Sequence, residues 1–185
     1  LYLDETWTGE HHILDDVRVP AGLTLTIEPG TELVIDGIAG DTGYNHALKI
    51  EGNLIADGVN IYSVTEKIGG WQGILIEGKG DLDNINLKHA KRGVAALIGS
   101  DIIIRNSTFE ENNLGVHTYG SFPLIEKTSF INNSWYGIKE DASGRPTVID
   151  CLFGRNSIDY YQQESSRITI EEINALSGNS GNRRQ

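Results

Sequence analysis

The chain of 185 residues has the size of a single domain, and its 38% hydrophobic residues and 22 glycines suit a turn-rich β fold better than a helical bundle. Its net charge of −11 disfavours nucleic acid and anionic lipid as partners, because both are bound mainly through basic side chains. The single cysteine excludes an internal disulfide, the five scattered histidines have no zinc-site spacing, and no apolar run is long enough to span a membrane.

Short predicted strands begin in the N-terminal part of the chain. Apolar runs at 23–27, 74–76 and 102–104 alternate with clusters of Gly, Asn and Asp. This alternation predicts many short strands joined by tight turns, and no amphipathic helix. Because the chain begins at Leu1 rather than Met, we expect an upstream segment, such as a signal peptide, to have been removed.

From residue 73 onward the pattern repeats every 20–23 residues, which separates a repeat fold from an all-β sandwich. The repeating Gly-aliphatic pairs are Gly73-Ile74, Gly93-Val94, Gly115-Val116 and Gly137-Ile138, and we place the next repeat at Ser157-Ile158. Two apolar columns share this period: Leu87, Phe109, Phe130, Phe153 and Ile173, and Leu82, Ile104, Ile125, Val148 and Ile168. Strands and sharp turns at this period are typical of a parallel β-helix, in which each coil buries its inward residues by stacking on its neighbours.

Asparagines also follow the period. Asn112, Asn133 and Asn156 each lie three residues after a phenylalanine, whereas Ala90 occupies this place in an earlier coil. Stacked coils would align these amides, so we predict a partial hydrogen-bonded asparagine ladder. We predict about eight coils over residues 1–176, opened by an N-terminal capping coil, and a flexible polar tail over 177–185.

Residues 17–31, with the sequence VRVPAGLTLTIEPGT, resemble the opening coil of secreted bacterial proteins of the pectate-lyase-like superfamily. Residues 6–9 and Ile13 fit the same opening, and the Phe-x-x-Asn and Gly-Ile repeats resemble the generic repeat of that superfamily. The resemblance implies an all-β, single-stranded right-handed parallel β-helix. The superfamily includes polysaccharide lyases, hydrolases and epimerases as well as adhesins and surface modules, so function has to be argued from a site.

Strict alternation along the strand that follows each glycine predicts two outward columns. The first column is Lys49, Leu75, Ala95, His117, Lys139 and Asp159, and the second is Glu51, Glu77, Leu97, Tyr119, Asp141 and Tyr161. Aromatic rings among polar groups suit the faces of sugars, so the C-terminal half of this surface is a candidate carbohydrate-binding surface. Its predicted members are His117, Tyr119, Trp135, Tyr136, Lys139, Asp141, Asp159 and Tyr161. Alternatively, Lys139 pairs with Asp159, the tyrosines cover the end of the rod, and nothing binds.

The N-terminal half of the same surface contains the candidate catalytic residues. Glu51 and Glu77 fall on successive coils, about 5 Å apart by the strand spacing, with Lys49 beside them. Such a group could hold Ca²⁺ or raise the pKa of one carboxyl group. Lyases of the resembled superfamily add a basic proton abstractor and further carboxylates on adjacent coils, but here Leu97 stands where a third acid would help. We assign no other metal site, and a binding role needs no cofactor.

Three functions remain open at this stage. We favour a secreted or cell-surface, non-catalytic module that contacts polysaccharide or another cell-surface component, as part of a longer surface protein or complex. The alternative is a polysaccharide lyase or epimerase that acts on acidic glycans with Lys49, Glu51 and Glu77. A spacer without a binding role is the third.

Overall fold

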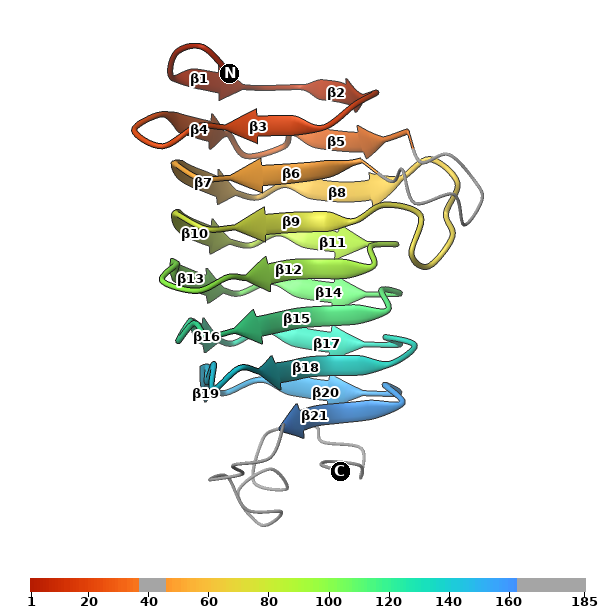
Figure 1. Cartoon of the computed structure of the whole chain (residues 1–185). Coiled ribbons are helices and arrows are strands. Elements are labelled where there is room, and N and C mark those ends of the chain that lie inside the picture. The colour runs from red at the N-terminus through yellow and green to blue at the C-terminus, as the bar shows by residue number, and fades with distance from the viewer. Residues whose placement is uncertain (37–45, 163–185) are drawn as a thin grey trace.

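The protein is a parallel β-solenoid with three faces (Figure 1). The computed structural model describes residues 1–36 and 46–162, and these residues form three parallel sheets of seven strands each. Each coil contributes one strand to each sheet, so the described residues make seven coils. The eighth predicted coil, with Ile168 and Ile173, and the predicted tail lie outside the described residues.

The strands are short, and consecutive strands belong to different sheets. Sheet A contains β1 (Glu5–Trp7), β4 (Thr24–Ile27), β7 (Asn53–Asp57), β10 (Lys79–Asp83), β13 (Asp101–Arg105), β16 (Leu124–Glu126) and β19 (Thr147–Ile149). Sheet B contains β2 (Glu10–Ile13), β5 (Glu32–Ile35), β8 (Asn60–Ser63), β11 (Asn86–Lys88), β14 (Thr108–Glu110), β17 (Ser129–Ile131) and β20 (Leu152–Gly154). Sheet C contains β3 (Val17–Val19), β6 (Ala47–Ile50), β9 (Gly73–Ile76), β12 (Arg92–Ala96), β15 (Leu114–Tyr119), β18 (Tyr136–Asp141) and β21 (Ile158–Gln162).

The core is a set of columns that run along the solenoid axis. Phe109, Phe130 and Phe153 are register neighbours in sheet B and are fully buried. Their rings stack at centroid distances of 5.5 and 5.2 Å. In sheet A, Ile104, Ile125 and Val148 are stacked in the same way. Both apolar columns predicted from the repeat are therefore confirmed over the described residues.

In the four coils that run from β10 to β20, two corners are each turned by a single residue with left-handed backbone. Asn84, Asn106, Lys127 and Asp150 each follow a strand of sheet A and have φ between 46° and 52°. His89, Glu111, Asn132 and Arg155 each follow a strand of sheet B and have φ between 55° and 65°. Only a few per cent of residues other than glycine adopt this conformation. Because each corner residue turns the chain at the same point of its coil, the next strand starts in register with the coil before it.

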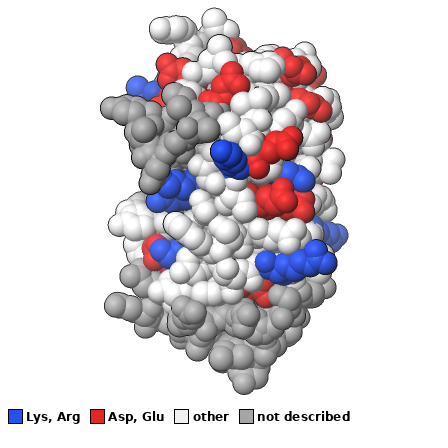
Figure 2. All heavy atoms as spheres, turned by 90° about the vertical axis from the view of Figure 1, so that its right-hand side faces the viewer, with Lys and Arg blue, Asp and Glu red and all other residues white. Residues whose placement is uncertain are grey.

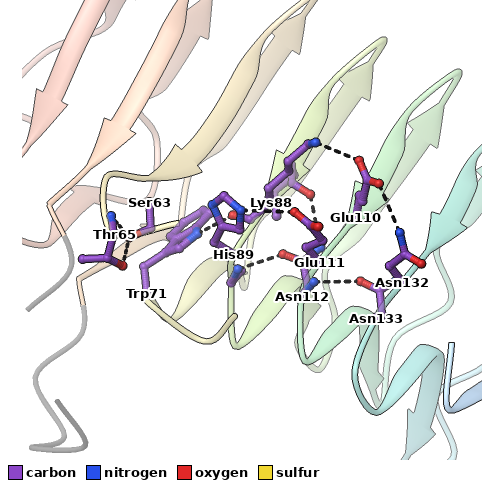
Figure 3. A network of polar contacts seen from close by, with 12 residues as sticks. Ser63, Thr65, Trp71, Lys88, His89, Glu110, Glu111, Asn112, Asn132 and Asn133 are labelled. Atoms are coloured by element: carbon purple, nitrogen blue, oxygen red, sulfur yellow. Dashed lines mark hydrogen bonds and ion pairs between the residues drawn. The ribbon is translucent and has the colours of Figure 1, made fainter. Parts of the chain in front are cut away.

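The predicted asparagine ladder is confirmed at the corner between sheets B and C (Figure 3). Oδ1 of Asn112, Asn133 and Asn156 accepts the backbone N–H of the residue one coil earlier, at 2.8, 3.1 and 3.0 Å respectively. Their Nδ2 groups donate to the carbonyls of Leu87, Phe109 and Phe130. The ladder therefore satisfies backbone groups that the turn removes from the sheets. Figure 3 also shows the Trp71 indole donating to the carbonyl of Lys88.

Candidate functional site

The outward face of sheet C brings most of the predicted site residues together. Lys49, Leu75, Ala95, His117 and Lys139 are register neighbours on five successive strands, as predicted. The column extends one strand further toward the N-terminus, where Arg18 lies beside Lys49. In the second column, Tyr119 lies beside Asp141, also as predicted.

The prediction for the last coil was wrong by two residues. Ile138 pairs with Tyr160, a step of 22 residues, whereas we expected Ser157-Ile158 to follow after 20. Tyr161 therefore lies beside Lys139 rather than beside Asp141. Asp159 follows Gly137 in the stack and is fully buried, so it does not belong to the outward surface. Asn156 donates to its carboxylate at 2.9 Å.

In the N-terminal half of this face, two of the three predicted catalytic residues are held by ion pairs. Lys49 forms an ion pair with Asp16. Arg18 donates two hydrogen bonds to Glu51, from Nε to Oε1 at 2.6 Å and from Nη2 to Oε2 at 2.8 Å. The hydrogen bonds from Arg18 lower the pKa of Glu51, so the expectation of a raised carboxyl pKa is wrong for this residue. No group of three or more His, Cys, Asp or Glu side chains within 1–36 and 46–162 is arranged to hold a metal ion.

Sequence reasoning missed Asp16 and Arg18, although Arg18 lies within the segment 17–31 that resembles the opening coil, and Asp16 immediately precedes that segment. The step from Arg18 to Lys49 is 31 residues because the coil between them is lengthened after β5. A search at a period of 20–23 residues therefore does not align β3 with β6. The usable signal was the shared Val-Arg-Val and Leu-Lys-Ile pattern, in which a basic residue is flanked by two aliphatic ones.

In the C-terminal half, a charged cluster forms around Asp141. His117 Nε2 and Lys139 Nζ both lie 2.7 Å from Asp141 Oδ2. The three side chains are only 12–26% exposed. Burial lowers the pKa of His117, and its hydrogen bond with Asp141 offsets this only in part. Burial would raise the pKa of Asp141, but hydrogen bonds from Lys139 and His117 hold that pKa below its usual value. The imidazole is therefore neutral near pH 7 and donates its Nε2 hydrogen to the carboxylate.

Two tyrosine rings flank this cluster. The rings of Tyr136 and Tyr161 meet at a centroid distance of 5.1 Å. Lys139 Nζ lies 6.0 Å from the first centroid and 5.8 Å from the second, within the range of cation–π attraction. The alternative pairing of Lys139 with Asp159 is wrong, because the lysine pairs with Asp141.

Exposed aromatic side chains lie at both ends of these strands. Trp135 immediately precedes β18 and is 53% exposed. Tyr119 ends β15, is 44% exposed and makes an edge contact with His117 at 6.4 Å. We call the seven residues His117, Tyr119, Trp135, Tyr136, Lys139, Asp141 and Tyr161 the sheet C cluster. It combines hydrogen-bonding groups fixed by their neighbours with aromatic surface open to solvent.

Charge is distributed unevenly along the solenoid. Residues 1–36 contain eight Asp and Glu against one Arg, which accounts for −7 of the net charge of −11. On the face drawn in Figure 2, acidic side chains predominate toward the N-terminal end, and basic side chains appear further along the rod. The sheet C cluster lies in the less acidic part.

Three parallel sheets wound into one solenoid, with a polar and aromatic cluster on an outer face, define a parallel β-helix protein. Residues 37–182 match the family model of the right-handed β-helix region, so the chain belongs to this family and its coil is right-handed. No curated protein and no solved structure matched the chain in the two other comparisons. The described part contains no helix with the length and apolar character that crossing a membrane requires.

Proposed function

We propose that this β-helix is a non-catalytic module that contacts saccharides outside the cell or at its surface, and that the sheet C cluster is the contact surface. The observation that carries the proposal is the packing of Tyr136 and Tyr161 around Lys139. Two partly open rings offer apolar surface to the C–H face of a sugar. The ammonium group of Lys139 near both rings, and the His117 imidazole on the neighbouring strand β15, supply hydrogen bonds at fixed positions.

Two further features support a contact role over catalysis. Most of the groups that could perform chemistry on sheet C are engaged, because Lys49 binds Asp16, Glu51 binds Arg18, and Asp141 binds both Lys139 and His117. Of the predicted catalytic residues, Glu77 alone is exposed without an ion pair to another described residue. The net charge of −11 also repels polyanions at long range, which disfavours the acidic glycans that the lyase or epimerase hypothesis needs. The resemblance of residues 17–31 to secreted bacterial β-helix proteins supports an extracellular location and a place within a longer surface protein.

The contact role is tested with a glycan array, followed by calorimetry on the saccharides that bind. We expect a double variant, Tyr136→Ala with Tyr161→Ala, to weaken binding at least about tenfold, because each ring contributes stacking area. Tyr2→Ala is the matched control, since Tyr2 is fully exposed and lies outside the cluster. Equal affinity for the double variant and the wild type would refute the sheet C assignment. A chain that binds nothing on the array would instead be a spacer.

The enzyme hypothesis has a separate test. Pectate and alginate are incubated with the protein and Ca²⁺, and unsaturated ends are followed by ultraviolet absorbance. We expect no increase in absorbance above buffer. Activity that disappears in Lys49→Ala would replace the contact role with a lyase.

A further inference from the structure

Sheet A carries an open hollow on its outer surface, away from the sheet C cluster. Its volume is about 360 Å³, which falls in the range of small-molecule sites. Its lining residues are Thr24, Asn53, Leu54, Ile55, Lys79, Gly80, Asp81, Asp101 and Ile103. These residues come from strands β4, β7, β10 and β13, which are consecutive in the sheet, so the hollow is a trough that follows the solenoid axis. We refer to it as the sheet A trough.

The two sides of the trough differ in chemistry. One side is the column Thr24, Asn53, Lys79 and Asp101, in which every side chain can form hydrogen bonds. The other side carries Ile55, which is 47% exposed, and Ile103, with Asp81 between them in the register. Arg105 Nη2 fixes the Asp81 carboxylate at 2.8 Å. The trough is therefore polar along one edge and mainly apolar along the other.

Two oppositely charged side chains in the trough form no ion pair with each other. Lys79 and Asp101 are register partners on adjacent strands, yet neither side chain makes an ion pair or hydrogen bond with another described residue. Two other register pairs of opposite charge form ion pairs, whereas Arg105 and its register partner Glu126 do not. Lys88 and Glu110 meet at 2.7 Å, and Asp83 and Arg105 meet at 3.3 Å. The exposed ammonium of Lys79 and the exposed carboxylate of Asp101 thus line the trough from adjacent strands, and neither is paired with another described side chain.

We propose that the sheet A trough is a second saccharide site, which takes a short neutral oligosaccharide lying along the solenoid axis. Neighbouring hydroxyl groups can donate to Asp101 and accept from Lys79 at the same time. The C–H face of the sugar then covers Ile55 and Ile103. The trough carries both signs of charge, because Lys79 stands beside Asp101 and Arg105 is shared between Asp81 and Asp83, so a neutral ligand meets no strong field of one sign.

An extended peptide fits this spacing less well. The polar column repeats at the strand spacing of about 4.8 Å, whereas side chains on one face of an extended peptide repeat at about 6.7 Å. A pyranose ring is close in length to one strand spacing, so successive sugars meet successive members of the column.

The experiment uses the double variant Tyr136→Ala with Tyr161→Ala as the parent, so that the sheet C cluster does not contribute. Calorimetry measures its affinity for neutral linear tetrasaccharides of glucose and of mannose, for a uronic acid tetramer, and for free leucine. Lys79→Ala and Asp101→Asn are then added separately. Lys67→Ala is the matched control, because it removes an exposed lysine outside the trough. Circular dichroism checks that every variant keeps the fold.

We expect a neutral tetrasaccharide to bind the parent, and Lys79→Ala and Asp101→Asn each to weaken that binding about tenfold, as loss of a hydrogen bond to a charged group does. Lys67→Ala should bind as the parent does. The site is refuted if the parent binds no neutral tetrasaccharide, if the two trough variants bind as well as the parent, or if leucine or the uronic acid tetramer binds more tightly. A parent that binds as strongly as wild type would count against the sheet C proposal alone.

Discussion

At the scale of single residues, the repeated glycines of sheet C are a packing requirement. A Cβ atom on Gly115 would lie 2.6 Å from the carbonyl oxygen of Gly137 and 2.6 Å from Cδ1 of Phe130. Gly93 and Gly137 are also confined by a carbonyl oxygen of the next coil, at 2.5 and 2.6 Å, and by a phenylalanine ring, at 2.7 and 3.1 Å. Glycine at this position lets the coils approach closely enough for the phenylalanines to stack beneath them.

We predict that Gly115→Ala lowers the free energy of unfolding by about 1–3 kcal/mol, the usual cost of overpacking a core. Gly154→Ala is the control, because a Cβ atom there meets nothing within 4 Å and the backbone is not left-handed. Urea denaturation of both variants measures the difference. Equal stability of the two variants would contradict this explanation of the repeat.

The protonation of His117 makes the stability of the folded protein depend on pH. Its pKa is lowered in the folded protein by burial, while the unfolded chain has the ordinary value of about 6.5. As pH falls below that value, the unfolded chain takes up a proton before the folded protein does, which favours unfolding. Lys139 and Arg92 add to this effect, because their positive charges oppose a protonated imidazole, and Asp141 acts against it.

We therefore predict that the free energy of unfolding decreases as the pH is lowered from 7.5 to 5, and that part of the decrease is absent in His117→Asn. Asp141 does not contribute in this window, because its lowered pKa keeps the carboxylate ionised well below pH 5. Urea denaturation at a series of pH values, run on both proteins, gives the two slopes. Identical slopes would show that burial does not perturb His117.

At the scale of elements, the corner between sheets B and C depends on amide side chains. Asn133 accepts a hydrogen bond from the backbone N–H of Asn112 at 3.1 Å and donates to the carbonyl of Phe109 at 3.1 Å. All three residues are buried, so neither backbone group can turn to water if the amide is removed. The ladder thus replaces the hydrogen bonds that a strand would supply.

We predict that Asn133→Ala costs about 3 kcal/mol, since it leaves a buried donor and a buried acceptor without partners. Asn113→Ala is the neighbouring control. Asn113 is half-buried, and its side chain donates to Ser134 Oγ at 2.9 Å, so removing this side chain should cost less than about 1 kcal/mol. Thermal unfolding of the two variants compares these costs directly.

At the scale of the whole molecule, the solenoid is held together by contacts between neighbouring coils. Within the described residues each strand pairs only with the strands of the coil before and the coil after it. Stability in such a molecule is close to a sum over coils and their interfaces. Removing one coil in register should therefore preserve the architecture.

We predict that deletion of residues 93–114, which joins Arg92 to Gly115, yields a shorter folded solenoid. Arg92 and Leu114 are register partners, so Gly115 takes the place of Gly93, and Phe130 then follows Leu87 in the apolar column. Deletion of residues 93–103 is the control, because it removes half a coil and brings inward and outward residues out of register. The first variant should keep its β-sheet circular dichroism and cooperative unfolding, and the second should lose both.

Much of the fold could be predicted from the sequence, because stacked coils need side chains of similar size at the same position of each coil. The phenylalanine column, the asparagine ladder and the glycine positions each repeat one residue type at nearly constant spacing. The last coil was misaligned because Asp159 replaces the glycine there, and the nearby Ser157-Ile158 imitates the small-aliphatic pair. A period also cannot align β3 with β6, where the coil is longer, so the ion pairs of Asp16 and Arg18 were missed.

The site was less predictable than the fold, because a column specifies which residues are neighbours but not how their side chains pair. His117, Lys139 and Asp141 were expected on one surface, yet only the three-dimensional arrangement joined both cations to one carboxylate oxygen. The spacing of Lys79 and Asp101 does not reveal that they form no ion pair. Lys88 and Glu110 are also 22 residues apart, and they do form one.

By itself the sequence determined that this chain winds into stacked parallel coils, because apolar residues that recur every 20–23 positions between short strands and turns are buried when each coil stacks on its neighbours. Only the tertiary structure decided which charged side chains form ion pairs, which rings flank Lys139 and where a trough lies on sheet A. These features depend on side-chain torsions and on the exact register of single strands, and neither leaves a periodic trace in the chain.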